Sequence, residues 1–411
     1  MMADLFWPGD ERAAAAFEQS TFLEAMVEVE LGWFHVLQGA GLAPKVADDA
    51  LDELVTKEDL AEIATKAEAS GNPVVPLVAL MRERLAARNN DAARWLHRGQ
   101  TSQDVLDTAL VLCARGAHRL VLADLDRQVA TLSELAERHR DDLMAGRTLT
   151  QHAVPITFGL KAAQWLQGVL DARDDLRATR FPIQLGGAAG TLAAVTELTG
   201  DTDAAQALVA DVAEALQLDP APPWHTSRAP FTRYADALVR ANDAWGHLAN
   251  DVLLLARPEI AELAEPGVEG RGGSSTMPQK ANPVLSLLIR RAALAAPGHA
   301  AQLHLAAAAT VDERPDGAWH TEWSTLAALS RHTLTAGSQV TELLDGLHVD
   351  TGRMAAVVKQ QSSALLAEQR SIREVSEATS DADFDPSHYL GATGRMIDLL
   401  IARGRGDQEI S

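Results

Sequence analysis

The 411-residue chain has a single cysteine, Cys113, and few aromatic side chains, which make up 4% of its residues. One cysteine excludes an internal disulfide and is typical of a reducing, intracellular compartment. The first residues, MMADLFWPGDER, contain neither a basic stretch nor an apolar core, so they predict no signal peptide. No apolar run approaches the roughly 20 residues of a transmembrane helix. The sequence therefore predicts a cytoplasmic protein without a membrane partner.

Positive charge is also scarce. The chain has 36 Lys and Arg against 57 Asp and Glu, which gives a formal net charge of −21. Because nucleic-acid binding needs a basic surface, we expect no nucleic-acid partner. The hydrophobic share of 47% is that of a globular protein, and the length is sufficient for two or three domains.

Proline is missing from long stretches, between Pro76 and Pro155 and between Pro315 and Pro386. An interior proline costs a helix about 3 kcal/mol, so these gaps permit long helices. Apolar residues recur at steps of three and four in the first of these gaps and again in a later segment, which predicts one helix face in each. The first face comprises Leu106, Leu110, Cys113, Ala117 and Leu120, and the second comprises Ala241, Trp245, Leu248, Val252 and Leu255.

Strand-like alternation is rare, so we predict an all-α fold. Its expected core is a long-helix bundle over residues 106–342, which includes a catalytic loop. Residues 1–105 form an N-terminal helical domain in this prediction, and residues 343–411 form a small C-terminal domain. The alanine-rich helices need apolar partners, which other copies of the chain can supply.

Three polar stretches interrupt the helical pattern. HRGQTSQDVLDTA (97–109) places Thr101 and Ser102 at a helix start, where hydroxyls either cap free N–H groups or bind a carboxylate. GRTLTQHAVPITFG (146–159) gathers Thr148, Gln151 and His152 before a proline, and a lone histidine at such a place is more often packed or solvated than a catalytic acid. QLGGAAGT (184–191) lacks the glycine spacing of a dinucleotide site, so it predicts close packing.

The fourth stretch is GRGGSSTMPQKANP (270–283). It is not a P-loop, because its hydroxyls precede Lys280 instead of following it. A plain surface loop explains its glycines, but not so many polar groups within ten residues. The chain has no histidine or cysteine spacing typical of a metal site, so we expect no metal, and without a dinucleotide motif we expect no cofactor. A Ser-His-Asp hydrolase is weakly supported, because the G-x-S-x-G motif is absent.

Residues 273–282, GSSTMPQKAN, resemble the signature loop G-S-S-x-M-P-x-K-x-N of the aspartase/fumarase superfamily at every fixed position. The TSQD and GRT-x-x-Q stretches are similar to its other two characteristic regions. Within the superfamily the chain most resembles the 3-carboxy-cis,cis-muconate cycloisomerase family. That resemblance lies in GNPVVPLV (71–78), QLGGAAGTLAA (184–194), PWHTSR (223–228) and ERPDGAWHTEW (313–323).

The resemblance implies a cofactor-independent enzyme that lactonises 3-carboxymuconate to 4-carboxymuconolactone in protocatechuate catabolism. It implies Ser274 as the base and Lys280 as the cation beside it. It leaves the proton donor unassigned, and His152 and His320 are the candidates for that role. It also implies a homotetramer in which three subunits contribute to each site. The residues that we expect to bind this polycarboxylate substrate are Thr101, Ser102, Thr148, Gln151, Ser275, Met277, Asn282, Arg314 and His320.

The chain departs from the superfamily pattern at two places. Adenylosuccinate lyases carry a histidine, their general acid, directly after GRT, and here that residue is Leu149. After LLAEQ (365–369) a helical stretch of a few dozen residues is missing, which predicts a shortened C-terminal domain.

Two alternatives stay open. One is a C–N or C–O lyase that releases fumarate from an N-substituted succinate, such as adenylosuccinate or nitrosuccinate. The other is a non-catalytic structural protein like the lens crystallins of the superfamily, against which the intact Ser274, Lys280 and Asn282 argue.

Overall fold

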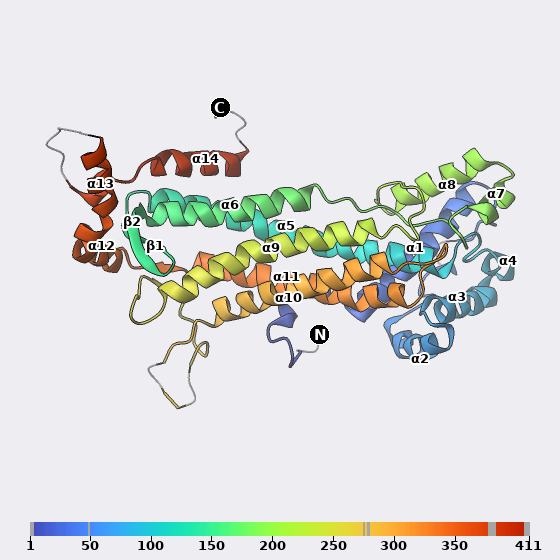
Figure 1. The fold of residues 1–411 in the computed structure, drawn as a ribbon. Helices are drawn as coiled ribbons and strands as arrows, with labels where there is room; N and C mark the ends of the chain where they lie inside the picture. The colour runs from blue at the N-terminus through green and yellow to red at the C-terminus, as the bar shows by residue number, and fades with distance from the viewer. Residues whose placement is uncertain (1–3, 48–49, 274–275, 278–279, 377–383, 407–411) are drawn as a thin grey trace. The chain divides into compact units, whose positions relative to one another are not determined.

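The computed structural model describes residues 4–47, 50–273, 276–277, 280–376 and 384–406. Helices make up most of this part of the chain (Figure 1), which confirms the predicted all-α fold. None of the described helices is both long and apolar enough to cross a membrane.

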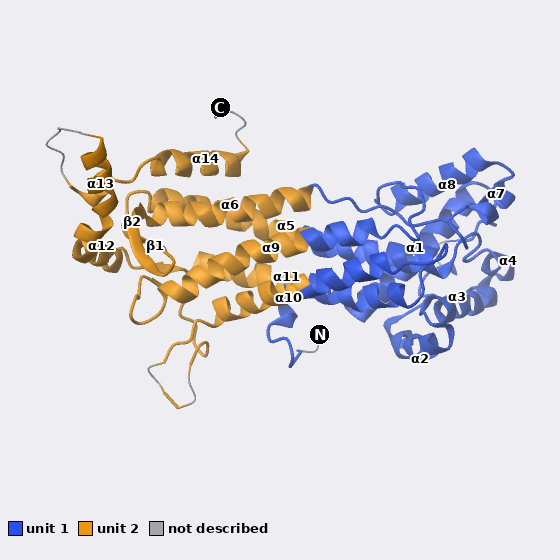
Figure 2. Cartoon of the chain, viewed as in Figure 1, with its two compact units in different colours: residues 1–120, 178–236, 298–332 blue, residues 121–177, 237–297, 333–411 orange. Residues whose placement is uncertain are grey.

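The chain divides into two compact units, each assembled from three segments (Figure 2). Unit 1 comprises residues 1–120, 178–236 and 298–332, and unit 2 comprises residues 121–177, 237–297 and 333–411. The boundaries fall within or at the ends of long helices, so four of them contribute residues to both units: α5 (Ser102–Arg138), α9 (Ala229–Leu255), α10 (Val284–Ala308) and α11 (Gly317–Asp345). The division into three domains that we expected from the sequence stays a prediction.

Unit 1 also contains the shorter helices of the first half of the chain. These are η1 (Asp10–Ala13), α1 (Gln19–Gly39), η3 (Lys57–Asp59), α2 (Leu60–Ser70), α3 (Val74–Arg88), α4 (Asn90–Ala93), α7 (Ala193–Thr199) and α8 (Thr202–Ala215). Helix α1 buries Trp33, Phe34 and Leu37 completely and packs against α8. Gly32 permits this approach, because a Cβ there would lie 3.2 Å from Leu216 Cδ2.

Unit 2 contains the described strands. Strands β1 (Leu143–Thr148) and β2 (Gln151–Thr157) form an antiparallel hairpin, and β3 (Leu263–Ala264) pairs with β4 (His348–Val349). The hairpin was not expected from the sequence. Its two-residue turn has positive φ at Leu149 and Thr150, a conformation that ends any helical course.

The C-terminal elements pack within unit 2. They are α12 (Thr351–Leu365), α13 (Ala367–Val375), η4 (Pro386–His388) and α14 (Thr393–Arg405). Helix α12 packs on the hairpin, and α14 packs on α6 (Phe158–Arg177). Arg403 of α14 forms ion pairs with Asp171 and Asp174 of α6, at 2.7 and 2.6 Å.

The two predicted helix faces lie on α5 and α9. On α9 the whole face is buried, from Ala241 to Leu255. On α5, Leu106, Leu110, Cys113 and Ala117 are buried, but Leu120 is 48% exposed. The apolar periodicity of α5 therefore extends beyond the residues that are buried within its unit.

Candidate active site

The start of α5 brings together two residues that are 213 positions apart in the sequence. The Nη1 of Arg314 donates to Thr101 Oγ1 over 3.2 Å, and the main-chain N–H of Thr101 donates to Asp104 Oδ2 over 2.9 Å. Thr101, Ser102 and Arg314 are each half-buried. A guanidinium, two hydroxyls and a helix N-terminus form an environment that favours a carboxylate ligand.

A tight turn directs the chain into α5. His97 and Gly99 adopt positive φ, at 61° and 85°. The turn is held by His97 Nδ1, which lies 2.6 Å from Glu30 Oε1. A Cβ at position 99 would lie 2.8 Å from Val195 Cγ2, so only glycine fits there.

His320 faces two main-chain carbonyls. Its Nε2 lies 2.7 Å from the oxygen of Gly71, and its Nδ1 lies 3.0 Å from the oxygen of Asp316. A carbonyl only accepts, and a neutral imidazole has one N–H, so both contacts are hydrogen bonds only when the ring is protonated. His320 thus links the Gly71 turn to the start of α11, and its roles as a substrate ligand and proton donor stay predictions.

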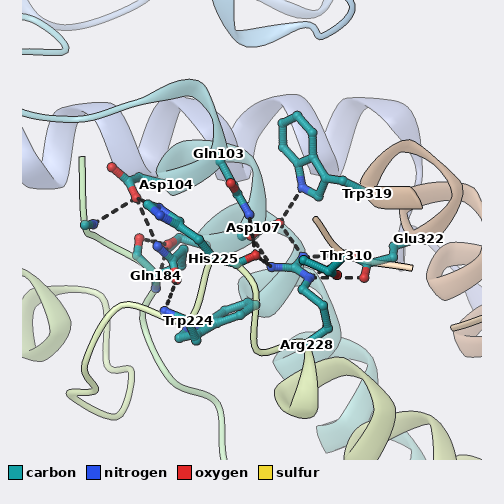
Figure 3. A network of polar contacts seen from close by, with 12 residues as sticks. Gln103, Asp104, Asp107, Gln184, Trp224, His225, Arg228, Thr310, Trp319 and Glu322 are labelled. Atoms are coloured by element: carbon teal, nitrogen blue, oxygen red, sulfur yellow. Dashed lines mark hydrogen bonds and ion pairs between the residues drawn. The ribbon is translucent and has the colours of Figure 1, made fainter. Parts of the chain in front are cut away.

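Behind the start of α5 lies a buried network of charged residues (Figure 3). Arg228 forms two hydrogen bonds with Asp107, at 2.7 and 2.9 Å, and approaches Glu322 Oε2 at 2.6 Å. The three side chains are at most 2% exposed. Burial raises the pKa of the Glu322 carboxyl, and its hydrogen bonds to Arg228 oppose that shift. The single guanidinium thus balances two carboxylates that lie in a water-poor environment.

A second branch of this network fixes the QLGG stretch. Asp104 accepts hydrogen bonds from the main-chain N–H groups of Gly186 and Gly187, both at 2.9 Å, and from Gln184 Nε2 at 3.1 Å. His225 Nε2 lies 2.9 Å from the same carboxylate. The close packing predicted for this stretch is present, because a Cβ on Gly186 would lie 2.7 Å from Pro223 Cβ.

No role was expected for the residues of this network. A signal was available on α5, where Asp104 and Asp107 lie three residues apart on one face of the helix. Carboxylates at such positions need buried partners. Those partners come from distant segments and could not be identified from local pattern: Gln184, His225, Arg228 and Glu322.

In unit 2 the hairpin carries three of the predicted site residues. Thr148 pairs with Gln151 beside the turn, His152 pairs with Arg147, and the side chains of Thr148, Gln151 and His152 are exposed. Arg147 anchors the hairpin by two hydrogen bonds to the fully buried Glu262, at 2.9 and 2.8 Å. The hairpin thus holds polar groups at a fixed position and leaves them accessible.

The glycine-rich loop also belongs to unit 2. Ser274 and Ser275 lie outside the described residues. Met277 and Lys280 are exposed, and the Lys280 main-chain N–H donates to the oxygen of Met277 over 3.0 Å. The Asn282 amide Nδ2 donates to the oxygen of Gly272 over 3.0 Å, so this side chain contacts the loop itself, and its contact with substrate stays a prediction.

The structure therefore brings Thr101 and Arg314 into contact in unit 1, and it brings Thr148, Gln151 and His152 together on the hairpin of unit 2. Ser102 and His320 also belong to unit 1. The remaining described ones belong to unit 2: Thr148, Gln151, His152, Met277, Lys280 and Asn282. Among the described residues, no group of three or more His, Cys, Asp or Glu is arranged to hold a metal ion.

Comparison with known proteins shows extensive similarity. Residues 24–298 match the model of a family described as lyase. Nitrosuccinate lyase from Streptomyces davaonensis is 40% identical over 94% of this chain and 91% of its own. The 3-carboxy-cis,cis-muconate cycloisomerase from Pseudomonas aeruginosa is 38% identical over 94% and 93%. The crystal structure of 3-carboxy-cis,cis-muconate lactonizing enzyme from Pseudomonas putida superposes with a TM-score of 0.88, at 30% identity, over 97% of each chain.

Proposed function

The chain belongs to the lyase family of the aspartase/fumarase superfamily, and on this premise we propose that it is a 3-carboxy-cis,cis-muconate cycloisomerase. Family membership makes it an enzyme and argues against a structural protein. The observation that carries the proposal is the contact between Arg314 and Thr101 at the start of α5. A guanidinium beside a hydroxyl and a helix N-terminus favours a carboxylate ligand, and the proposed substrate has three carboxylates.

In the proposed reaction one carboxylate of the substrate adds to the conjugated diene. A C–O bond forms, the adjacent carbon gains a proton, and no group leaves. Negative charge develops on a second carboxylate as its neighbouring carbon changes, so cations and hydroxyls near that group stabilise the transition state. Arg314, Thr101 and the N-terminus of α5 provide this stabilisation in the proposal.

Ser274 is the proposed group that exchanges the proton at carbon. A serine hydroxyl needs a nearby cation or N–H donors to act as an alkoxide at neutral pH, and Lys280 is the proposed cation. His152 remains the candidate for a second proton-transferring group, because it stands on the accessible side of the anchored hairpin.

Nitrosuccinate elimination is the second candidate. It is favoured by the 40% identity to the Streptomyces davaonensis lyase. Its first step, removal of a proton beside a carboxylate, needs the same serine. The C–N bond then breaks, and fumarate and nitrite are released.

Two assays on the purified enzyme separate these candidates. The first follows the loss of 3-carboxymuconate absorbance, and the second measures fumarate and nitrite formed from nitrosuccinate. We expect a kcat/KM at least tenfold higher for 3-carboxymuconate. A higher value for nitrosuccinate would overturn the cycloisomerase proposal in favour of the lyase.

In either case we expect Ser274→Ala to abolish turnover and to leave the oligomer intact, and a retained wild-type rate would remove Ser274 from the mechanism.

We also propose that the enzyme is a homotetramer with shared sites. Leu287 and Leu294 on α10 are 48% and 74% exposed, and their spacing of seven places them on one helix face. An apolar face of this kind favours contact with another copy. Mixing the inactive variant Ser274→Ala with the impaired variant Arg314→Ala should raise the activity above that of Arg314→Ala alone if different subunits supply these residues. A mass of one chain in sedimentation would contradict the tetramer.

A further inference from the structure

The indole ring of Trp319 lies beside the guanidinium of Arg314. The Arg314 Cζ lies 5.2 Å from the ring centroid, within the range of a cation–π interaction. The ring is only 2% exposed. It therefore offers Arg314 a surface from which water is largely excluded, where such an interaction is stronger than at an exposed position.

One edge of this ring is fixed by a charged group. The indole N–H of Trp319 donates to Asp107 Oδ1 over 2.8 Å, and Figure 3 shows this bond at the edge of the buried network. Asp107 cannot turn away, because Arg228 also binds it by two hydrogen bonds. The network thus defines the orientation of the indole ring.

A second aromatic ring constrains the indole from another direction. Trp323, one helical turn further along α11, packs against Trp319 with centroids 4.8 Å apart at 87°. Edge-to-face packing of this kind restricts the tilt of both rings. Trp319 is therefore held at its N–H and by a ring contact, whereas the Arg314 side chain is only half-buried.

We propose that Trp319 is a positioning residue, which holds the Arg314 guanidinium against Thr101 so that it is ready for a substrate carboxylate. This inference depends on the proposed function in one respect only, which is the identity of the substrate whose carboxylate Arg314 binds.

Crystal structures of two variants test the geometry without any assay. Trp319→Phe removes the N–H donor and keeps an aromatic face, so we expect Arg314 to remain within hydrogen-bonding distance of Thr101. Trp319→Leu removes the face, so we expect Arg314 to leave Thr101. If Trp319→Leu does not fold, Trp319→Met serves in its place, because its flexible side chain adapts to the space that the indole ring leaves. Arg314 still bound to Thr101 in the non-aromatic variant would overturn the proposal.

Kinetics provide a second test, with whichever of the two substrates the wild-type enzyme converts. We expect Trp319→Leu to lower kcat/KM about tenfold, because the displaced guanidinium no longer stabilises the transition state, and Trp319→Phe to have a much smaller effect. Trp245→Phe is the matched control, because Trp245 is also buried and donates its indole N–H, to Gln128. It should leave kcat/KM unchanged.

A double-mutant cycle separates positioning from general damage. In an Arg314→Met background, which should retain a low activity, Trp319→Leu should have almost no further effect on kcat/KM, because the group that it positions is gone. Independent, multiplicative effects of the two substitutions would contradict the proposal. If neither substrate is converted, the proposed function fails while the crystal structures still decide the role of Trp319.

Discussion

Asn282 closes the glycine-rich loop by two hydrogen bonds to one carbonyl, that of Gly272. Its main-chain N–H lies 2.8 Å from that oxygen, and its Nδ2 lies 3.0 Å from it. Gly272 has φ of 73°, and a Cβ there would lie 2.5 Å from the oxygen of Asn282. The base of the loop therefore requires glycine both for its backbone conformation and for space. Just beyond it, Glu265 binds the main-chain N–H groups of Leu285 and Ser286 at the start of α10.

Gly272→Ala should therefore impair catalysis more than folding. The substitution strains the backbone by about 1 to 3 kcal/mol and separates Gly272 from Asn282. We expect kcat/KM to fall by roughly tenfold or more, with little change in the melting temperature because the strain is confined to a surface loop. Gly267→Ala is the matched control, since nothing lies within 4 Å of a Cβ there. Equal activities of the two variants would show that the loop base does not position the site.

The Arg228 network should contribute strongly to stability. Arg228→Met leaves Asp107 and Glu322 buried without their cation, and removal of one partner from a buried ion pair costs about 3 to 5 kcal/mol. Urea denaturation followed by circular dichroism measures this loss. The exposed pair Lys66–Glu62 provides a control, and Lys66→Met should leave the midpoint unchanged. A midpoint for Arg228→Met near that of the control would show that the network contributes little.

Local pattern predicted the helices of this fold well. The α9 face from Ala241 to Leu255 is buried throughout, because apolar spacing directly reflects which side of a helix packs. The hairpin was not predicted, because its turn residues Leu149 and Thr150 are not the usual choices for positive φ. A hairpin whose turn departs from these preferences leaves no local signal in the sequence.

The sequence predicted which residues and motifs belong to the site, but it did not predict the contacts between them. Thr101 and Arg314 were expected to bind the same substrate, and their direct contact required the structure. Arg228 lies 121 residues from Asp107 and 94 from Glu322, so no spacing in the sequence relates them. Ion pairs between distant segments depend on how helices pack, which a single sequence does not specify.

Stability should decline in acid partly because of His118. This side chain is 8% exposed and packs edge-on against Phe181, at 5.0 Å between ring centroids. Burial, followed by the charge of Arg119, lowers the pKa of its imidazole from 6.5 to about 4. The native state thus binds fewer protons than the unfolded state between these values, so this contribution is complete above pH 6.5 and is lost as the pH falls toward 4.

The size of this effect is about 2 to 3 kcal/mol. His118→Phe removes the titrating group and keeps the aromatic contact, so its free energy of unfolding should fall less than that of the wild type between pH 7 and 4.5. Urea denaturation at a series of pH values measures both curves. His35→Gln, at an exposed position on α1, should follow the wild type. Parallel curves for His118→Phe and the wild type would exclude His118 as the source.

The turn of the hairpin combines an unfavourable backbone with an exposed apolar side chain. Leu149 has φ of 50° and is 96% exposed. A left-handed conformation costs a non-glycine residue about 1 to 2 kcal/mol, whereas asparagine tolerates it. Leu149→Asn should thus raise the free energy of unfolding by about 1 kcal/mol.

The same substitution should lower kcat/KM if the leucine side chain contributes to the site beside Thr148 and Gln151. Strain retained at an exposed turn is typical of functional positions. Gln217→Asn is the matched control, because Gln217 is also exposed and has φ of 55° just after α8. It should gain similar stability and keep full activity. Thermal denaturation and steady-state kinetics on both variants distinguish a functional leucine from a merely unfavourable turn residue. Unchanged activity in Leu149→Asn would show that the Leu149 side chain does not contribute to catalysis.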